Sequence, residues 1–145
     1  MKFILENLIG IVSITVLTLN TIILSCLLIP LGLIKFFLPI TDMKVLLTKF
    51  IINIGELWIF TNKIWVKALH KPNWEIIGKE NIKSNGWTIA TSNHQSFADI
   101  FLLQDITNMQ MPMLKFFMKY VLIYVPIICL SWWALDMPFL KRYTK

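Results

Sequence analysis

No charged residue stands between Glu6 and Lys35, and this gap constrains the chain more than any other feature. Residues 7–34 are mostly Leu, Ile and Val, with Ser, Thr and Asn among them. A helix of about 20 apolar residues crosses a bilayer, whereas the apolar part of a signal peptide has only about 7–15. We therefore expect an uncleaved transmembrane helix that ends near Pro30 and Gly32.

Composition and charge agree with a membrane protein. The chain is 57% hydrophobic and only 15% charged, with a formal net charge of +6. The lysines alternate with long apolar runs, which favours anionic lipid as the partner and argues against nucleic acid. Lys2 precedes the expected span, and six lysines follow it within residues 35–71. Positive charge marks the cytoplasmic side, so we expect the part of the chain that follows the span to lie in the cytoplasm, at the inner membrane if the cell is bacterial.

Two further apolar segments have more than one interpretation. Residues 44–69 have the pattern of a helix with a broad apolar face, which suits either the headgroup interface or packing on a domain core. Residues 120–135 are uncharged, but they are short for a span and Pro126 interrupts them. We expect this second segment to dip into the membrane or to pack in a core.

The order of elements near residue 90 predicts an α/β domain. Residues 74–78 alternate like a strand, and residues 87–91 are a compact candidate for a buried strand. Ser92 and Asn93 are good residues for the start of a helix, which the apolar residues after Ala98 continue. A strand, a short loop and a helix in this order indicate an α/β arrangement, in which polar chemistry lies in the loop after the strand.

That loop contains an HxxxxD pair, His94 and Asp99. A histidine titrates near neutral pH, and a neighbouring carboxylate fixes its tautomer and stabilises the imidazolium. On a regular helix the two side chains would lie about 140° apart, so a contact requires His94 to precede the helix. The bare pair also fits a histidine that caps a helix. Ser96 is a poor nucleophile candidate because no glycine elbow surrounds it.

The stretch from Asn93 through His94 and Ser96 to Asp99 resembles the first motif of the phospholipid/glycerol acyltransferase family, N-H-x-S-x-x-D. That family includes the 1-acylglycerol-3-phosphate acyltransferases. A proline followed sixteen residues later by an arginine, as in residues 126–142, resembles the second motif region of the family. The resemblance covers nearly the whole chain.

The resemblance implies a role for each of these residues. His94 is the general base, Asp99 orients it, and Arg142 holds the phosphate of the acceptor, although Arg142 also fits a surface charge beside Lys141 and Lys145. The acceptor is a lysophospholipid or 1-acylglycerol-3-phosphate. The acyl donor is a thioester, either acyl-CoA or acyl-acyl carrier protein. No cofactor and no metal site are indicated, and the oligomeric state is open.

The resemblance also has limits. Cys129 stands where the family often has glycine, and the third and fourth motifs of the family would follow Arg142. We therefore expect a membrane anchor in residues 1–40 and an incomplete N-terminal part of the acyltransferase domain in residues 41–145. Activity is expected to be impaired in this chain. The alternative is a non-catalytic, membrane-anchored remnant that binds lipid or a partner.

Overall fold

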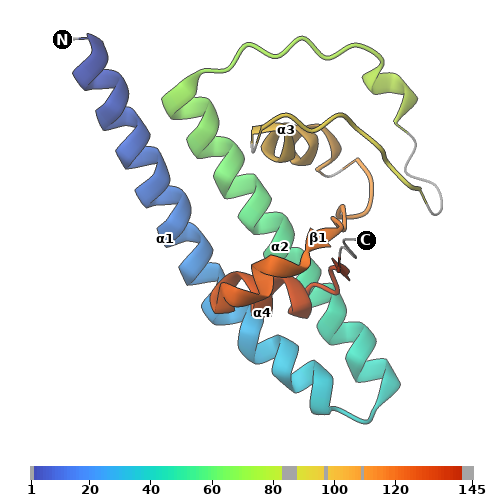
Figure 1. Ribbon diagram of the computed structural model, residues 1–145. Coiled ribbons are helices and arrows are strands. Elements are labelled where there is room, and N and C mark those ends of the chain that lie inside the picture. The colour runs from blue at the N-terminus through green and yellow to red at the C-terminus, as the bar shows by residue number, and fades with distance from the viewer. Residues whose placement is uncertain (1, 83–87, 97, 109, 142–145) are drawn as a thin grey trace. The chain divides into compact units, whose positions relative to one another are not determined.

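The computed structural model describes residues 2–82, 88–96, 98–108 and 110–141. These residues are mostly helical (Figure 1). The α-helices are α1 (Lys2–Phe37), α2 (Thr41–His70), α3 (Ala98–Thr107) and α4 (Pro126–Ala134), and short 3₁₀ helices η1 and η2 cover Lys79–Asn81 and Tyr120–Tyr124. Strands β1 (Met118–Lys119) and β2 (Phe139–Leu140) pair in parallel. The chain divides into two compact units, Met1–Thr18 with Ile59–Leu114 and Leu19–Trp58 with Lys115–Lys145.

Helix α1 is long and apolar enough to cross a membrane, and it is the one helix of this kind among the described residues. It does not end at Pro30 or Gly32, as the sequence suggested, but continues to Phe37. Proline lacks one backbone donor, a loss that a long apolar helix tolerates when neighbouring groups compensate. The helix stops just before Pro39, because the residue preceding a proline is disfavoured in the α conformation.

Gly32 serves close packing within the second unit. A Cβ atom at Gly32 would lie 2.5 Å from the Cβ of Ala134, so α1 and α4 approach each other at this point. Nearby, the Ser131 hydroxyl donates a buried hydrogen bond of 2.8 Å to Ser25. The ammonium group of Lys35 donates a hydrogen bond of 3.0 Å to the backbone oxygen of Ala134. A cation at this position interacts favourably with the carbonyl end of the α4 dipole. The C-terminal half of α1 therefore carries α4 on one face (Figure 1).

The end of α4 turns the chain into β2. Asp136 has a positive φ of 56°, and its N–H bonds to the oxygen of Trp133 while the N–H of Met137 bonds to the oxygen of Trp132. This pair of hydrogen bonds is the Schellman motif, and Asp136 takes the left-handed position that glycine usually fills. Parallel strands need a crossover connection. Helix α4 supplies it between β1 and β2, so residues 118–140 form a small βαβ unit.

The two strands predicted at residues 74–78 and 87–91 are not formed in the described part of the chain. Residues 74–77 and 88–91 run without regular secondary structure, and Trp87 lies outside the described residues. A strand is stabilised by hydrogen bonds to a neighbour. Neither segment pairs with another among the described residues, and Ile89 stays 88% exposed instead of packing inside.

Candidate active site

His94 and Asp99 are brought together at the start of α3. His94 lies in the loop before the helix, and Asp99 lies in its first turn. The Nδ1 atom of His94 is 3.4 Å from Oδ2 of Asp99. This separation is longer than the 2.7–2.9 Å typical of a charge-assisted hydrogen bond. Catalytic contacts are often long without substrate and tighten when it binds.

The Asp99 carboxylate also organises the loop that carries His94. Its Oδ2 atom accepts the backbone N–H of Gln95 at 2.7 Å and that of Ser96 at 2.8 Å. The Ser96 hydroxyl in turn accepts the N–H of Ala98 at 3.2 Å, so Ser96 serves as a helix-start residue. The HxxxxD spacing therefore has a local physical reason. The hydrogen bonds to the Asp99 carboxylate hold the loop next to the start of α3, so the imidazole of His94 lies beside the carboxylate.

The electrostatics of this pair favour an ionised carboxylate. Hydrogen bonds from the Ser96 and Gln95 backbones, joined by the charge and hydrogen bond of His94, hold the pKa of Asp99 below its ordinary 3.8. The His94 side chain is 59% exposed and that of Asp99 is 33% exposed. The ring is therefore open to a substrate, while the carboxylate beside it stays negative at neutral pH.

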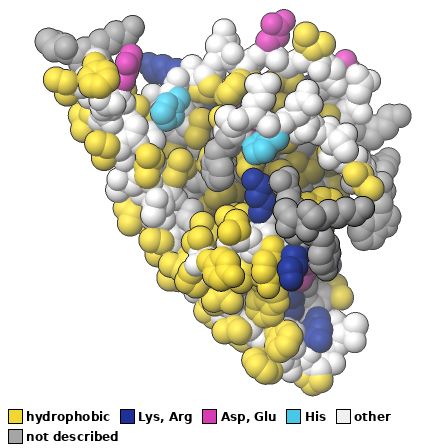
Figure 2. All heavy atoms as spheres, viewed as in Figure 1, with side chains coloured by type: hydrophobic (Ala, Val, Ile, Leu, Met, Phe, Trp, Pro, Cys, Tyr) yellow, Lys and Arg dark blue, Asp and Glu magenta, His cyan; other side chains and the backbone are white. Residues whose placement is uncertain are grey.

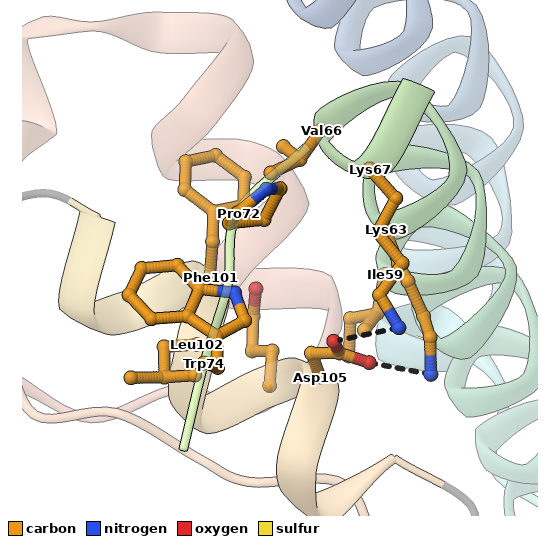
Figure 3. A pocket seen from close by; sticks show the side chains of 10 residues that line it. Ile59, Lys63, Val66, Lys67, Pro72, Trp74, Phe101, Leu102 and Asp105 are labelled. Carbon is orange, nitrogen blue, oxygen red and sulfur yellow. Dashed lines mark ion pairs between the residues drawn. The ribbon is translucent and has the colours of Figure 1, made fainter. Parts of the chain in front are cut away.

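Helix α3 is fastened to α2 by ion pairs within the same unit. One carboxylate oxygen of Asp105 contacts the ammonium group of Lys63 (Figure 3). The other carboxylate oxygen lies 3.3 Å from the ammonium group of Lys67. Burial acts to raise the pKa of Asp105, but the two ammonium groups outweigh it and hold the pKa below the ordinary value. Asp105 is therefore ionised at neutral pH and ties α3, which begins next to His94, to α2.

These ion pairs border a small cavity of about 20 Å³, which is room for about one water molecule. Trp74 and Phe101 lie on its apolar side (Figure 3). Gln104 also lines it and is only 4% exposed, and its Oε1 atom has no hydrogen-bond partner among the residues that the structure describes. The sequence pattern did not predict this cluster. Lysines four residues apart share a helix face, but that spacing does not reveal a partner 38 residues further along the chain.

The remaining predicted site residue is Arg142, which lies outside the described residues. Among the described residues, no group of three or more His, Cys, Asp or Glu side chains is arranged to hold a metal ion. The pair that the structure brings together is thus a histidine and a carboxylate, two groups that can act together in proton transfer.

Comparison with protein families places the chain in a known class. A family model described as Acyltransferase matches residues 73–145, which are 73 of the 145 residues and include His94 and Asp99. The family match therefore indicates a transferase of acyl groups. The chain belongs to the phospholipid/glycerol acyltransferase family. Comparisons with curated proteins and with solved structures gave no match.

Proposed function

We propose that this protein transfers a fatty acyl group to a free hydroxyl of a lysophospholipid or of 1-acylglycerol-3-phosphate, in phospholipid biosynthesis or remodelling. The donor is the thioester of acyl-CoA or of acyl-acyl carrier protein. The observation that carries the proposal is the 3.4 Å approach of His94 Nδ1 to Asp99 Oδ2 within the part of the chain that matches the family.

In the proposed mechanism, His94 is the general base. Because Nδ1 faces the Asp99 carboxylate, it carries the proton in the neutral ring, and Nε2 is left to accept another. Nε2 takes the proton of the acceptor hydroxyl while its oxygen attacks the thioester carbonyl carbon. The carbon–sulfur bond then breaks, and the imidazolium returns its proton to the leaving thiolate. The products are an ester and a free thiol.

Asp99 supports this reaction in two ways. Its negative charge stabilises the imidazolium that forms when His94 accepts the proton. Its hydrogen bonds to the Gln95 and Ser96 backbones hold the loop in place, so the ring does not have to be ordered during the reaction. The carboxylate is ionised at neutral pH, because its pKa is held below the ordinary 3.8 by these backbone hydrogen bonds and by His94.

The anchor and the acceptor site complete the proposal. Helix α1 holds the domain of residues 41–145 at the membrane, with the catalytic side in the cytoplasm. Arg142 binds the acceptor phosphate through bidentate hydrogen bonds, for which a guanidinium group is suited. The small parallel βαβ unit of residues 118–140 supports an α/β class for the domain, because such units belong to parallel sheets with helical crossovers.

One observation favours a second candidate function. The Asp99 carboxylate already stabilises the start of α3 through two backbone hydrogen bonds, a role that a protein without catalytic activity would also retain. A membrane-anchored remnant that binds lipid or a partner therefore fits the same local geometry. Turnover separates this candidate from the enzyme.

The test is an assay of acyl transfer in membranes that contain the protein. Membranes are incubated with acyl-CoA or acyl-acyl carrier protein and, in separate reactions, with lysophosphatidate and other lysophospholipids. Mass spectrometry is expected to find one acceptor that gains an acyl group, together with release of a free thiol. An absence of product above that of membranes lacking the protein, with every donor and acceptor, would leave the binding remnant.

A further inference from the structure

The proposed base, His94, is carried by α3. The Asp99 carboxylate in the first turn of this helix lies 3.4 Å from the imidazole and accepts the backbone N–H groups of Gln95 and Ser96. A shift of α3 therefore moves the base with it. The helix has ten residues, whereas isolated helices shorter than about 12–15 residues are marginal in water. The packing of α3 on its neighbours therefore decides where His94 lies.

The contacts near the other end of α3 are made with α2. Asp105 lies about 9 Å further along the helix axis than Asp99, and its side chain leaves the helix roughly 120° away from that of Asp99. Its carboxylate pairs with the ammonium groups of Lys63 and Lys67 on α2, and its side chain is only 16% exposed (Figure 3). The two carboxylates of α3 therefore have different partners. Asp99 holds the loop of the base, and Asp105 holds α2.

Helix α2 in turn lies on α1 within the same compact unit. The Nε2 atom of His70, the last residue of α2, is 2.8 Å from the hydroxyl oxygen of Ser13 on α1, and Ser13 is buried. Among the described residues, α1 is the helix that is long and apolar enough to cross a membrane, and hydrophobic side chains follow it in Figure 2. The ion pairs of Asp105 therefore stand between the membrane helix and the proposed base.

We propose that Asp105 is a positioning residue, which holds His94 at the distance from the bilayer where the hydroxyl of a membrane-embedded acceptor lies. The acyl chain of a lysolipid is held in the bilayer by the hydrophobic effect, so its hydroxyl stays at the level of the headgroups and cannot follow a displaced base. A misplacement of about 1 Å costs up to ~10²-fold in rate. The proposal rests on the proposed function, and it adds that the acceptor reacts while it stays in the membrane.

The experiment compares two acceptors with the same protein in proteoliposomes. One is a lysophospholipid with a long acyl chain that resides in the bilayer, and the other is a short-chain lysophospholipid dissolved in water as monomers. The ratio of the two kcat values does not depend on the folded fraction of a variant, because both acceptors meet the same protein. In Asp105→Asn we expect the ratio of bilayer to dissolved acceptor to fall at least about tenfold. A purely structural role would lower both rates alike.

The matched control is Asp136→Asn. The Asp136 carboxylate also lies near two lysines, Lys35 at 2.8 Å and Lys115 at 3.7 Å, but it belongs to the other compact unit. Asparagine tolerates the positive φ at this position. The ratio should be unchanged in Asp136→Asn. The reversed pair, Lys63→Asp with Asp105→Lys, should recover most of the ratio because an ion pair between α2 and α3 is formed again.

A second measurement does not need turnover. Cys26 and Cys129 are replaced by serine, and a fluorophore is attached to Gln95→Cys, next to His94. Nitroxide groups on lipid headgroups then report how close this position lies to the bilayer surface. We expect clear quenching in the otherwise unaltered protein, a loss of quenching when Asp105→Asn is added, and no loss when Asp136→Asn is added.

Four results would overturn the proposal. They are an unchanged acceptor ratio in Asp105→Asn, an equal fall of the ratio in Asp136→Asn, a reversed pair that stays at the Asp105→Asn ratio, and quenching at residue 95 that ignores Asp105→Asn. Transfer to neither acceptor by the unaltered protein would instead refute the proposed function. The quenching measurement would then still decide whether Asp105 positions the loop of His94 at the membrane.

Discussion

Replacement of Gly32 by alanine tests the packing that holds α4 on α1. The added Cβ would lie 2.5 Å from the Cβ and 3.2 Å from the Cα of Ala134, whereas carbon atoms pack at about 3.5–4.0 Å. The helices must therefore separate by roughly 1 Å at this point. That movement also stretches the 2.8 Å bond between Ser131 and Ser25 and the 3.0 Å bond from Lys35 to Ala134.

The expected loss follows from three contributions. Overpacking costs about 1–3 kcal/mol, and each weakened hydrogen bond adds up to about 1 kcal/mol. The higher helix propensity of alanine returns about 1 kcal/mol. We therefore expect the docking of α4 to weaken by about 2 kcal/mol, the middle of a range of ~0–4 kcal/mol, which corresponds to a factor of about 30 in the population of the opened helix.

Gly10→Ala is the matched control, because no atom lies within 4 Å of the Cβ added in the same helix. Hydrogen exchange measured by mass spectrometry on a peptide covering residues 126–134 reads the docking directly. Gly32→Ala should exchange faster in this peptide and Gly10→Ala should not. The double variant Gly32→Ala with Ala134→Gly should recover much of the protection. Unchanged exchange in Gly32→Ala would refute the close approach of the two helices.

Three further predictions concern the second half of the chain. Asp99→Asn keeps an oxygen for the loop but removes the charge beside His94, so kcat should fall roughly 10²–10⁴-fold; an unchanged kcat would take the carboxylate out of the mechanism. Asp105→Asn should lower the free energy of unfolding by about 1–3 kcal/mol in thermal denaturation, because the carboxylate is only 16% exposed and pairs with two lysines. The pKa of Asp105 is depressed in the folded protein, so the stabilisation is present above pH 3.8 and is lost as pH falls through the lower folded pKa. The Asp105→Asn variant should lack this acid dependence of stability. Identical profiles of stability against pH for the variant and the unaltered protein would contradict the ion pairs. Arg142→Ala should raise KM for the acceptor with little effect on KM for the donor, whereas Lys145→Ala should change neither; equal behaviour of the two variants would favour a surface charge at Arg142.

Much of the fold near the N-terminus could be predicted from local patterns. The uncharged stretch after Glu6 predicted a long apolar helix, and the helix expected over residues 44–69 is present as α2. Pro126 was expected to interrupt its segment, and it stands at the first position of α4. A proline is tolerated there because the backbone N–H that it lacks would have no partner within the helix. Length, periodicity and proline positions are local properties, so one sequence reveals them.

The predictions were wrong where the local structure depends on residues far away in the sequence. Gly32 was taken as the end of a helix, but its small size admits Ala134, which lies 102 residues later. The strand predicted at residues 87–91 needs a pairing partner, which no local pattern can supply. In the site, the requirement that His94 precede the helix followed from geometry alone. The hydrogen bonds of Asp99 to the loop backbone could not be read from the sequence, because they depend on backbone orientation.

The measurement that tests the central claim most directly compares the two histidines of the chain. Acyl transfer to a lysophospholipid is measured in membranes carrying the unaltered protein, His94→Ala or His70→Gln. His70 is the control, since its ring contacts Ser13 at 2.8 Å and has no place in the proposed reaction. We predict that the unaltered protein and His70→Gln transfer acyl groups, while His94→Ala inserts into the membrane normally and has almost no turnover. Turnover that persists in His94→Ala would contradict the account.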